Sequence, residues 1–112
     1  MPDTMDPRLI GGMEMIRRTG AKSVSLRFHD DEPPTVWLAI VVYDDRRWET
    51  DAGHSPLEAM MRLCERVIDG GLCAHCHKPT AFAAELEQEF EKDLLCWYVW
   101  DPELKTFRRG CE

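Results

Sequence analysis

No apolar segment of the 112-residue sequence approaches the roughly 20 residues that a membrane-spanning helix requires. The N-terminus, MPDTMDPR, also lacks the basic and apolar regions of a secretory leader. We therefore expect the protein to stay in the cytoplasm where it is made and to have no membrane partner. Thiols are kept reduced there, so closely spaced cysteines bind metal ions more often than they form disulfides.

Basic residues are also too few to favour binding to nucleic acid. The chain has 14 lysine and arginine residues against 21 acidic ones, a net charge of −7, and such a charge repels phosphate backbones. Its 44% hydrophobic and 31% charged residues are typical of a globular domain. A chain of this length can bury one core of modest size, so we expect one core with a metal-bound extension.

Residues 1–70 are predicted to form an α-β-β-β-α domain that begins and ends with a capped helix. The first helix starts at Asp6-Pro7, an N-cap side chain followed by proline at the first helical position, and stops near Gly20. The second starts at the sequence SPLE of residues 55–58, in which serine and glutamate can cap amides of the first turn. It closes at the glycine pair 70–71.

Three strands are predicted between these helices. Apolar and polar residues alternate over 23–28, which is the pattern of a half-buried strand. Residues 35–43 (TVWLAIVVY) are apolar on both faces, as expected of a central strand that is covered on both sides. A shorter strand follows at 46–50, and the short links imply an antiparallel three-stranded sheet. The expected fold class is therefore α+β, an α-β-β-β-α sandwich followed by a small metal-binding part.

Residues 71–112 are predicted to form that second part, a zinc-ribbon-like knuckle, a short connector helix at 83–93 and a β-hairpin. The knuckle is the sequence CAHC of residues 73–76, whose spacing lets two thiolates bind one tetrahedral ion. The hairpin pairs residues 95–100 with residues 105–109 around a turn that contains a proline.

The hairpin register decides where the remaining cysteines lie. If Trp100 pairs with Lys105, Cys96 lies across from Arg109, and Cys111 lies diagonally on the same face. The four sulfurs then converge, and we predict a structural Zn²⁺ site. Its ligands are Cys73, Cys76, Cys96 and Cys111.

Other interpretations of the same residues stay open. His75 or His77 can replace one sulfur, because zinc accepts nitrogen as readily as sulfur, and the thiols can also remain reduced without a metal. A catalytic zinc would need an open coordination position and a general base, for which Glu85 is the close candidate. We favour a closed structural site and predict no catalytic residues. Cys64 falls on the apolar stripe of the second helix and is expected to be a buried hydrophobic residue.

A mixed aromatic and basic surface on the hairpin is the candidate binding surface. It comprises Trp97, Lys105, Arg108 and Arg109, a combination that can stack bases and contact phosphates. The same basic residues would also offset the net charge of −2 of a zinc ion with four thiolates. We predict a non-enzymatic, zinc-binding accessory protein that binds another protein, with a nucleic-acid-associated regulator as the alternative.

The order α-β-β-β-α resembles the double-stranded-RNA-binding fold and the small ABA-sandwich domain of phage proteins. RNA-binding members place lysines at the start of the second helix. This chain has HSPLEA at 54–59 there, which contains no lysine. The whole chain resembles a family of small proteins encoded by actinobacterial phages, including mycobacteriophages, through DPRLIGGMEMIRRTGAKS, RLCERVIDGG, C-x-H-C and LCWYVWDPELKTFRRGCE. The resemblance implies an accessory protein in the cytoplasm of an infected bacterium, with a host or phage protein as its partner.

Overall fold

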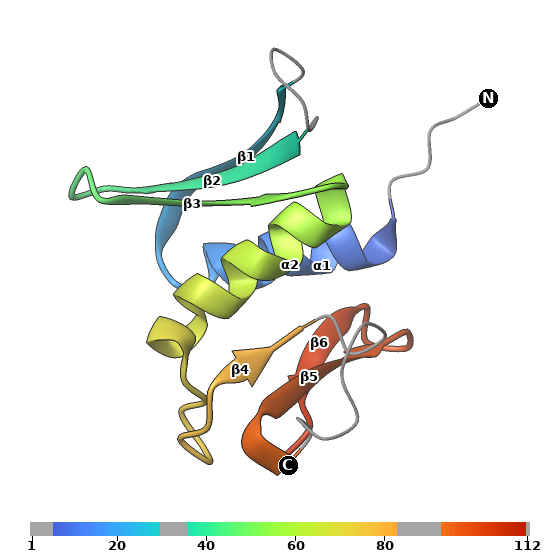
Figure 1. Ribbon diagram of the computed structural model, residues 1–112. Helices are drawn as coiled ribbons and strands as arrows, with labels where there is room; N and C mark the ends of the chain where they lie inside the picture. The colour runs from blue at the N-terminus through green and yellow to red at the C-terminus, as the bar shows by residue number, and fades with distance from the viewer. Residues whose placement is uncertain (1–5, 30–35, 83–92, 112) are drawn as a thin grey trace.

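The computed structural model describes residues 6–29, 36–82 and 93–111. Two helices lie between a larger and a smaller β-sheet, so the fold has three layers (Figure 1). The elements in chain order are α1 (Pro7–Arg17), β1 (Ala21–His29), β2 (Val36–Tyr43), β3 (Trp48–Gly53), α2 (Pro56–Val67), the 3-10 helix η1 (Ile68–Gly71), β4 (Thr80–Ala81), β5 (Cys96–Asp101) and β6 (Thr106–Arg109).

Both predicted helices begin where their capping residues indicate. The Asp6 carboxylate accepts from the Arg8 amide at 2.8 Å and starts α1. The Ser55 hydroxyl accepts from the Glu58 amide at 3.0 Å, and the Glu58 carboxylate accepts from the His54 amide at 2.6 Å. These bonds satisfy amides that have no partner within the first helical turn. The predicted caps by Asp6 and Ser55 are therefore confirmed, whereas Glu58 reaches back to the amide of the residue before the cap.

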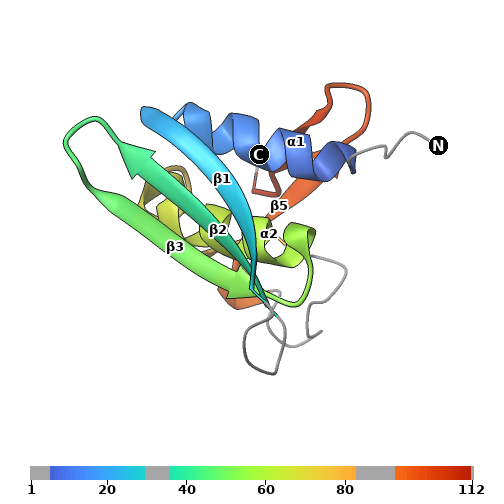
Figure 2. The same cartoon turned by 90° about the horizontal axis from the view of Figure 1, so that it is seen from above.

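The larger sheet has the order β1-β2-β3, and all its strands are antiparallel, as predicted. Both helices cover the same face of this sheet (Figures 1 and 2). Along β2, the buried residues Ala39, Val41 and Tyr43 alternate with Leu38, Ile40 and Val42, which are half-buried. The expectation that β2 is covered on both sides is therefore not met by the described residues.

The smaller sheet has the order β4-β5-β6, in which β4 is parallel to β5 and β6 is antiparallel to it. The predicted hairpin register is wrong by two residues, because Trp100 pairs with Phe107 instead of Lys105. The Asp101 carboxylate accepts from the amides of Glu103 and Leu104, at 2.9 and 3.2 Å, and holds a turn at 102–105, one residue later than the predicted turn at 101–104. Nearly all of the predicted connector helix 83–93 lies outside the described residues.

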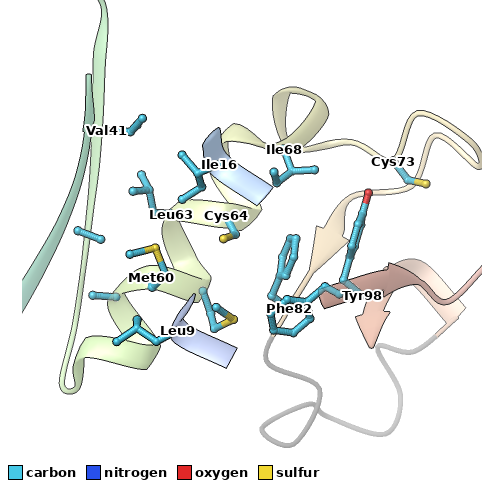
Figure 3. Close-up of a cluster of buried hydrophobic side chains, with 14 of the residues drawn as sticks. Leu9, Ile16, Val41, Met60, Leu63, Cys64, Ile68, Cys73, Phe82 and Tyr98 are labelled. Atoms are coloured by element: carbon cyan, nitrogen blue, oxygen red, sulfur yellow. The ribbon is translucent and has the colours of Figure 1, made fainter. Parts of the chain in front are cut away.

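One continuous apolar core joins residues of the two predicted parts. Figure 3 shows α2 between the larger sheet and the hairpin, with side chains packed on both sides of the helix. Phe82 stacks on Tyr98 with ring centroids 4.5 Å apart, and Phe107 meets Phe82 edge to face at 5.3 Å. Members of the core from across the chain include Leu9, Ile16, Val41, Met60, Leu63, Cys64, Phe82, Tyr98 and Phe107. Cys64 is fully buried, as predicted.

The close approach of α1 to the hairpin can be tested at Gly11. A Cβ atom on Gly11 would lie 2.5 Å from the Trp100 ring, so alanine forces that ring to shift. Alanine also gains about 1 kcal/mol of helix propensity over glycine. We expect the clash to outweigh this gain, with Gly11→Ala lowering the free energy of unfolding by about 1–3 kcal/mol in urea denaturation. The control, Glu14→Ala on the exposed side of α1, should change it by less than about 0.5 kcal/mol. A more stable Gly11→Ala variant would contradict the close contact.

Candidate metal centre

Three separate segments deliver four cysteines to one place. Cys73 and Cys76 lie in the turn between η1 and β4, Cys96 is the first residue of β5, and Cys111 follows β6. Their sulfur atoms all lie within 4.8 Å of one another. The structure thus brings together the four cysteines that the sequence predicts as ligands.

The distances between these sulfurs suit a shared metal ion. The Sγ atom of Cys111 lies 3.6 Å from that of Cys73 and 3.6 Å from that of Cys96. Four sulfurs bound tetrahedrally at about 2.3 Å from one zinc ion lie about 3.8 Å apart, whereas sulfurs in a disulfide lie about 2.05 Å apart. All four cysteines are free thiols. The group can therefore hold a metal ion.

The backbone of the turn at 73–78 shapes the first half of the site. The His77 amide donates to the Cys73 carbonyl at 2.9 Å, and the Cys73 amide donates to the Lys78 carbonyl at 2.7 Å. The Cys73 sulfur accepts from the amides of His75 and Cys76, at 3.3 and 3.5 Å. His77 adopts a φ of +64°, which lets the chain reverse here. The turn thus surrounds one sulfur with amide donors.

The hairpin supplies the second half through its register. Tyr98 pairs with Arg109, and the Gly110 amide donates to the Trp97 carbonyl at 2.7 Å. Continued by one more pair, this register puts Cys96 directly opposite Cys111. The corrected register therefore explains the short contact between their sulfurs better than the diagonal arrangement expected from the sequence.

Ionisation of the four thiols is unequal. Burial opposes ionisation of Cys73, but the amides of Cys76 and His75 and the thiols of Cys96 and Cys111 donate to its sulfur and lower its pKa to about 6. Burial and the three neighbouring sulfurs raise the pKa of Cys96 to about 12. The pKa of Cys111 is also raised, first by burial. One thiolate forms readily here, and a bound cation would stabilise the thiolates of Cys96 and Cys111.

The histidines beside the turn occupy different positions. His75 Nδ1 lies 3.4 Å from the Cys111 sulfur, within hydrogen-bond distance, and both histidines are exposed. Neither His75 nor His77 belongs to the group of ligand atoms that are mutually within 4.8 Å. Glu85, the candidate general base of a catalytic zinc, lies outside the described residues. The geometry therefore favours the four sulfurs over a mixed ligand set.

The predicted binding surface is divided between the two faces of the hairpin. Trp97 and Arg108 share one face, and Arg108 forms an ion pair with Asp101 at 3.7 Å. Arg109 lies on the opposite face, where it forms an ion pair with Asp69 at 3.7 Å and donates to the Tyr98 hydroxyl at 3.3 Å. Lys105 lies in the turn between the strands, where its φ is +54°. Nucleic-acid binding through these residues stays a prediction.

Asp69 is a residue of the site that the sequence analysis missed. Its carboxylate accepts from the Ala74 amide at 3.4 Å and forms the ion pair with Arg109, so it links the turn at 73–78 to the hairpin. Asp69 and Gly70 both adopt positive φ angles. An aspartate before a glycine pair is the signal for this turn, because aspartate and glycine tolerate the left-handed conformation better than most residues.

In comparisons with protein-family models, curated proteins and solved structures, nothing matches this chain. Among the residues that the structure describes, no helix is long and apolar enough to cross a lipid bilayer. The cysteine cluster and the surfaces beside it are therefore the features that bear on function.

Metal binding should depend steeply on pH, with tighter binding at higher pH. Cys96 and Cys111 have pKa values above the ordinary thiol value, so both are protonated at neutral pH and must release protons to bind a cation. Release of at least two protons raises the apparent affinity about 100-fold or more per pH unit. Chelator competition for Zn²⁺ at several pH values between about 6 and 8 measures this slope. The same slope is expected in Cys64→Ala, which removes a thiol outside the cluster, and a slope of one proton or less would contradict the assignment.

Proposed function

We propose that this chain is a zinc-binding protein in which the metal is structural. The observation that carries the proposal is the convergence of four sulfurs, from three segments of the chain, to within 4.8 Å of one another. Sets of four thiolates in tetrahedral arrangement favour zinc or iron–sulfur centres over magnesium, calcium or manganese, and a single ion with four protein ligands is the pattern of structural zinc.

The closed ligand set supports a structural role over a catalytic one. Catalytic zinc sites keep one coordination position open for water or substrate, whereas four cysteines fill all four positions of a tetrahedral ion. Zn²⁺ bound in this way would neutralise part of the thiolate charge and fix Cys73 and Cys76 against the end of the hairpin. We propose accordingly that the protein is not an enzyme and that the metal contributes folding free energy.

A groove next to the hairpin supports a role in binding another protein. It has a volume of about 620 Å³ and lies between the ends of α1 and α2 and the hairpin. Met15, Val67 and Phe107 contribute apolar walls. Three arginines (Arg18, Arg108 and Arg109) line the groove against one acidic residue, Asp69, so its lining has a net positive charge although Arg108 and Arg109 are ion-paired. Concave, mainly apolar sites of this size with a few polar groups bind small ligands, and a few side chains of a protein segment fill a similar volume. We propose that it receives an acidic segment of a host or phage protein.

The proposed biological setting rests on the sequence resemblance alone. Membership of the family of actinobacterial-phage proteins would make this chain an accessory protein in the cytoplasm of an infected bacterium. Its metal centre would then stabilise a small interaction module whose remaining core is of modest size.

The metal assignment predicts the metal content of a series of cysteine variants. Native mass spectrometry of protein from zinc-supplemented cells should show one zinc ion per wild-type chain. Cys73→Ser, Cys96→Ser and Cys111→Ser should each lose it, because three remaining sulfurs hold zinc less tightly. Two controls, His75→Ala and Cys64→Ala, should keep one ion. A metal-free wild type, or zinc retained in all three serine variants, would sink the four-cysteine site.

The structural role predicts the effect of metal removal. Structural zinc contributes on the order of 10 kcal/mol of apparent binding free energy in small domains, so chelation should lower the unfolding temperature sharply. Tyr98 and Trp100 belong to the hairpin that the metal would hold, so near-ultraviolet circular dichroism should lose its aromatic signal at the same time. Re-addition of Zn²⁺ should restore both readings. A metal-free protein with unchanged stability and an unchanged aromatic signal would contradict a structural metal.

A further inference from the structure

The larger sheet has a face that no described residue covers. Figure 2 looks down on this face, with the helices behind it. The strand register defines it as three rows across β1, β2 and β3, which we call the open face. The rows are Ser23, Val42 and Trp48; then Ser25, Ile40 and Thr50; then Arg27, Leu38 and Ala52.

The composition of the open face is unusual for a solvated sheet surface. Only one of its nine positions, Arg27, is charged and none is acidic, although 31% of the chain is charged and 21 residues are acidic. Trp48 has 62% of its surface exposed. Antiparallel sheets that face water normally carry polar side chains on that face. The apolar residues of the open face, Leu38, Ile40, Val42, Trp48 and Ala52, are neighbours across β2 and β3, and contiguous apolar surface of this kind marks an interaction site.

We propose that a second copy of this chain covers the open face in a symmetric dimer. The arrangement of large and small side chains supports this occupant. From the first row to the third, the side chains on β1 are small, small and large (Ser23, Ser25, Arg27). Those on β3 are large, medium and small in the same order (Trp48, Thr50, Ala52). A twofold axis parallel to β2, between two facing sheets, places β1 of one copy over β3 of the other at the same level.

This axis makes the face complementary to itself. Trp48 of each copy then packs over Ser23 of its partner, and Arg27 packs its aliphatic part over Ala52 with its charged end free to reach water. Val42, Ile40 and Leu38 meet their equivalents along the centre. Two sheets pack in this way about 10 Å apart, with strands within about 30° of parallel. The surface therefore interdigitates with a copy of itself without juxtaposing like charges at its centre.

Charge also favours this face for self-association. Two copies with a net charge of −7 each repel one another, so contact is least unfavourable where acidic side chains are absent. Standard interfaces involve about 20–30 residues on each side, and the open face is smaller. We therefore expect a reversible dimer with a dissociation constant of roughly 1–100 µM, which tightens as salt screens the repulsion.

Sedimentation velocity of the metal-loaded full chain, from about 1 µM to 1 mM, tests the dimer. The wild type should pass from monomer to dimer, and Ile40→Asp should weaken dimerisation more than tenfold because two buried carboxylates would face each other. Leu104→Asp, the same kind of change at an exposed position on the hairpin, should leave dimerisation unchanged. A wild type that stays monomeric throughout this range overturns the proposal and leaves the face to a different partner.

Exchanging the sizes of the side chains at positions 23 and 48 tests the proposed twofold axis. Both positions are exposed, so these variants should not affect folding. Ser23→Trp should weaken the dimer because two tryptophans would meet, and Trp48→Ser should weaken it because a cavity would form. The double variant Ser23→Trp/Trp48→Ser exchanges the two sizes and should restore dimerisation to near the wild-type level. Circular dichroism and zinc content check that each variant is folded. A double variant weaker than both single ones would overturn the proposed axis.

Discussion

Four sulfur atoms held within 4.8 Å of one another constrain the whole C-terminal part of the chain. Unscreened thiolates at that distance repel strongly, and the pKa of Cys96, raised to about 12 by burial and its sulfur neighbours, reflects this cost. A divalent cation bound there would reverse the sign of the interaction and join three segments that are distant in sequence. Because the hairpin also packs on α1 through Trp100 and lines the groove, a metal that fixes the hairpin supports both the core and the proposed binding surface.

Local interactions made the larger part of the fold predictable from the sequence. Asp6 and Ser55 each satisfy amides within three residues, so the starts of both helices follow from short segments of chain. The antiparallel sheet follows from short links between apolar segments. The four cysteines could also be identified from their spacing, because a C-x2-C pair and two hairpin cysteines have few ways to satisfy one tetrahedral ion.

The features that escaped prediction depend on contacts that the sequence does not state. Asp101 holds the turn one residue later in the chain through two amides, and this shifts the register by two residues and makes Cys96 oppose Cys111 directly. The two-residue strand β4 is too short to carry a pattern and exists through its pairing with β5. The apolar pattern of β2 was correct, but it cannot tell a face covered by the same chain from one that another molecule covers.

The three-layer arrangement separates these two surfaces. The helices lie between the larger sheet, which carries the open face, and the hairpin, which carries two of the four clustered cysteines (Figure 1). Helix α2 is buried on both sides, so it packs against the larger sheet on one side and the hairpin on the other. The open face and the groove lie on opposite sides of the helical layer. A dimer formed through the open face would therefore leave both metal centres and both grooves accessible. Two grooves presented by one symmetric particle would bind a repeated or dimeric partner more tightly than either groove alone, because the second contact is intramolecular.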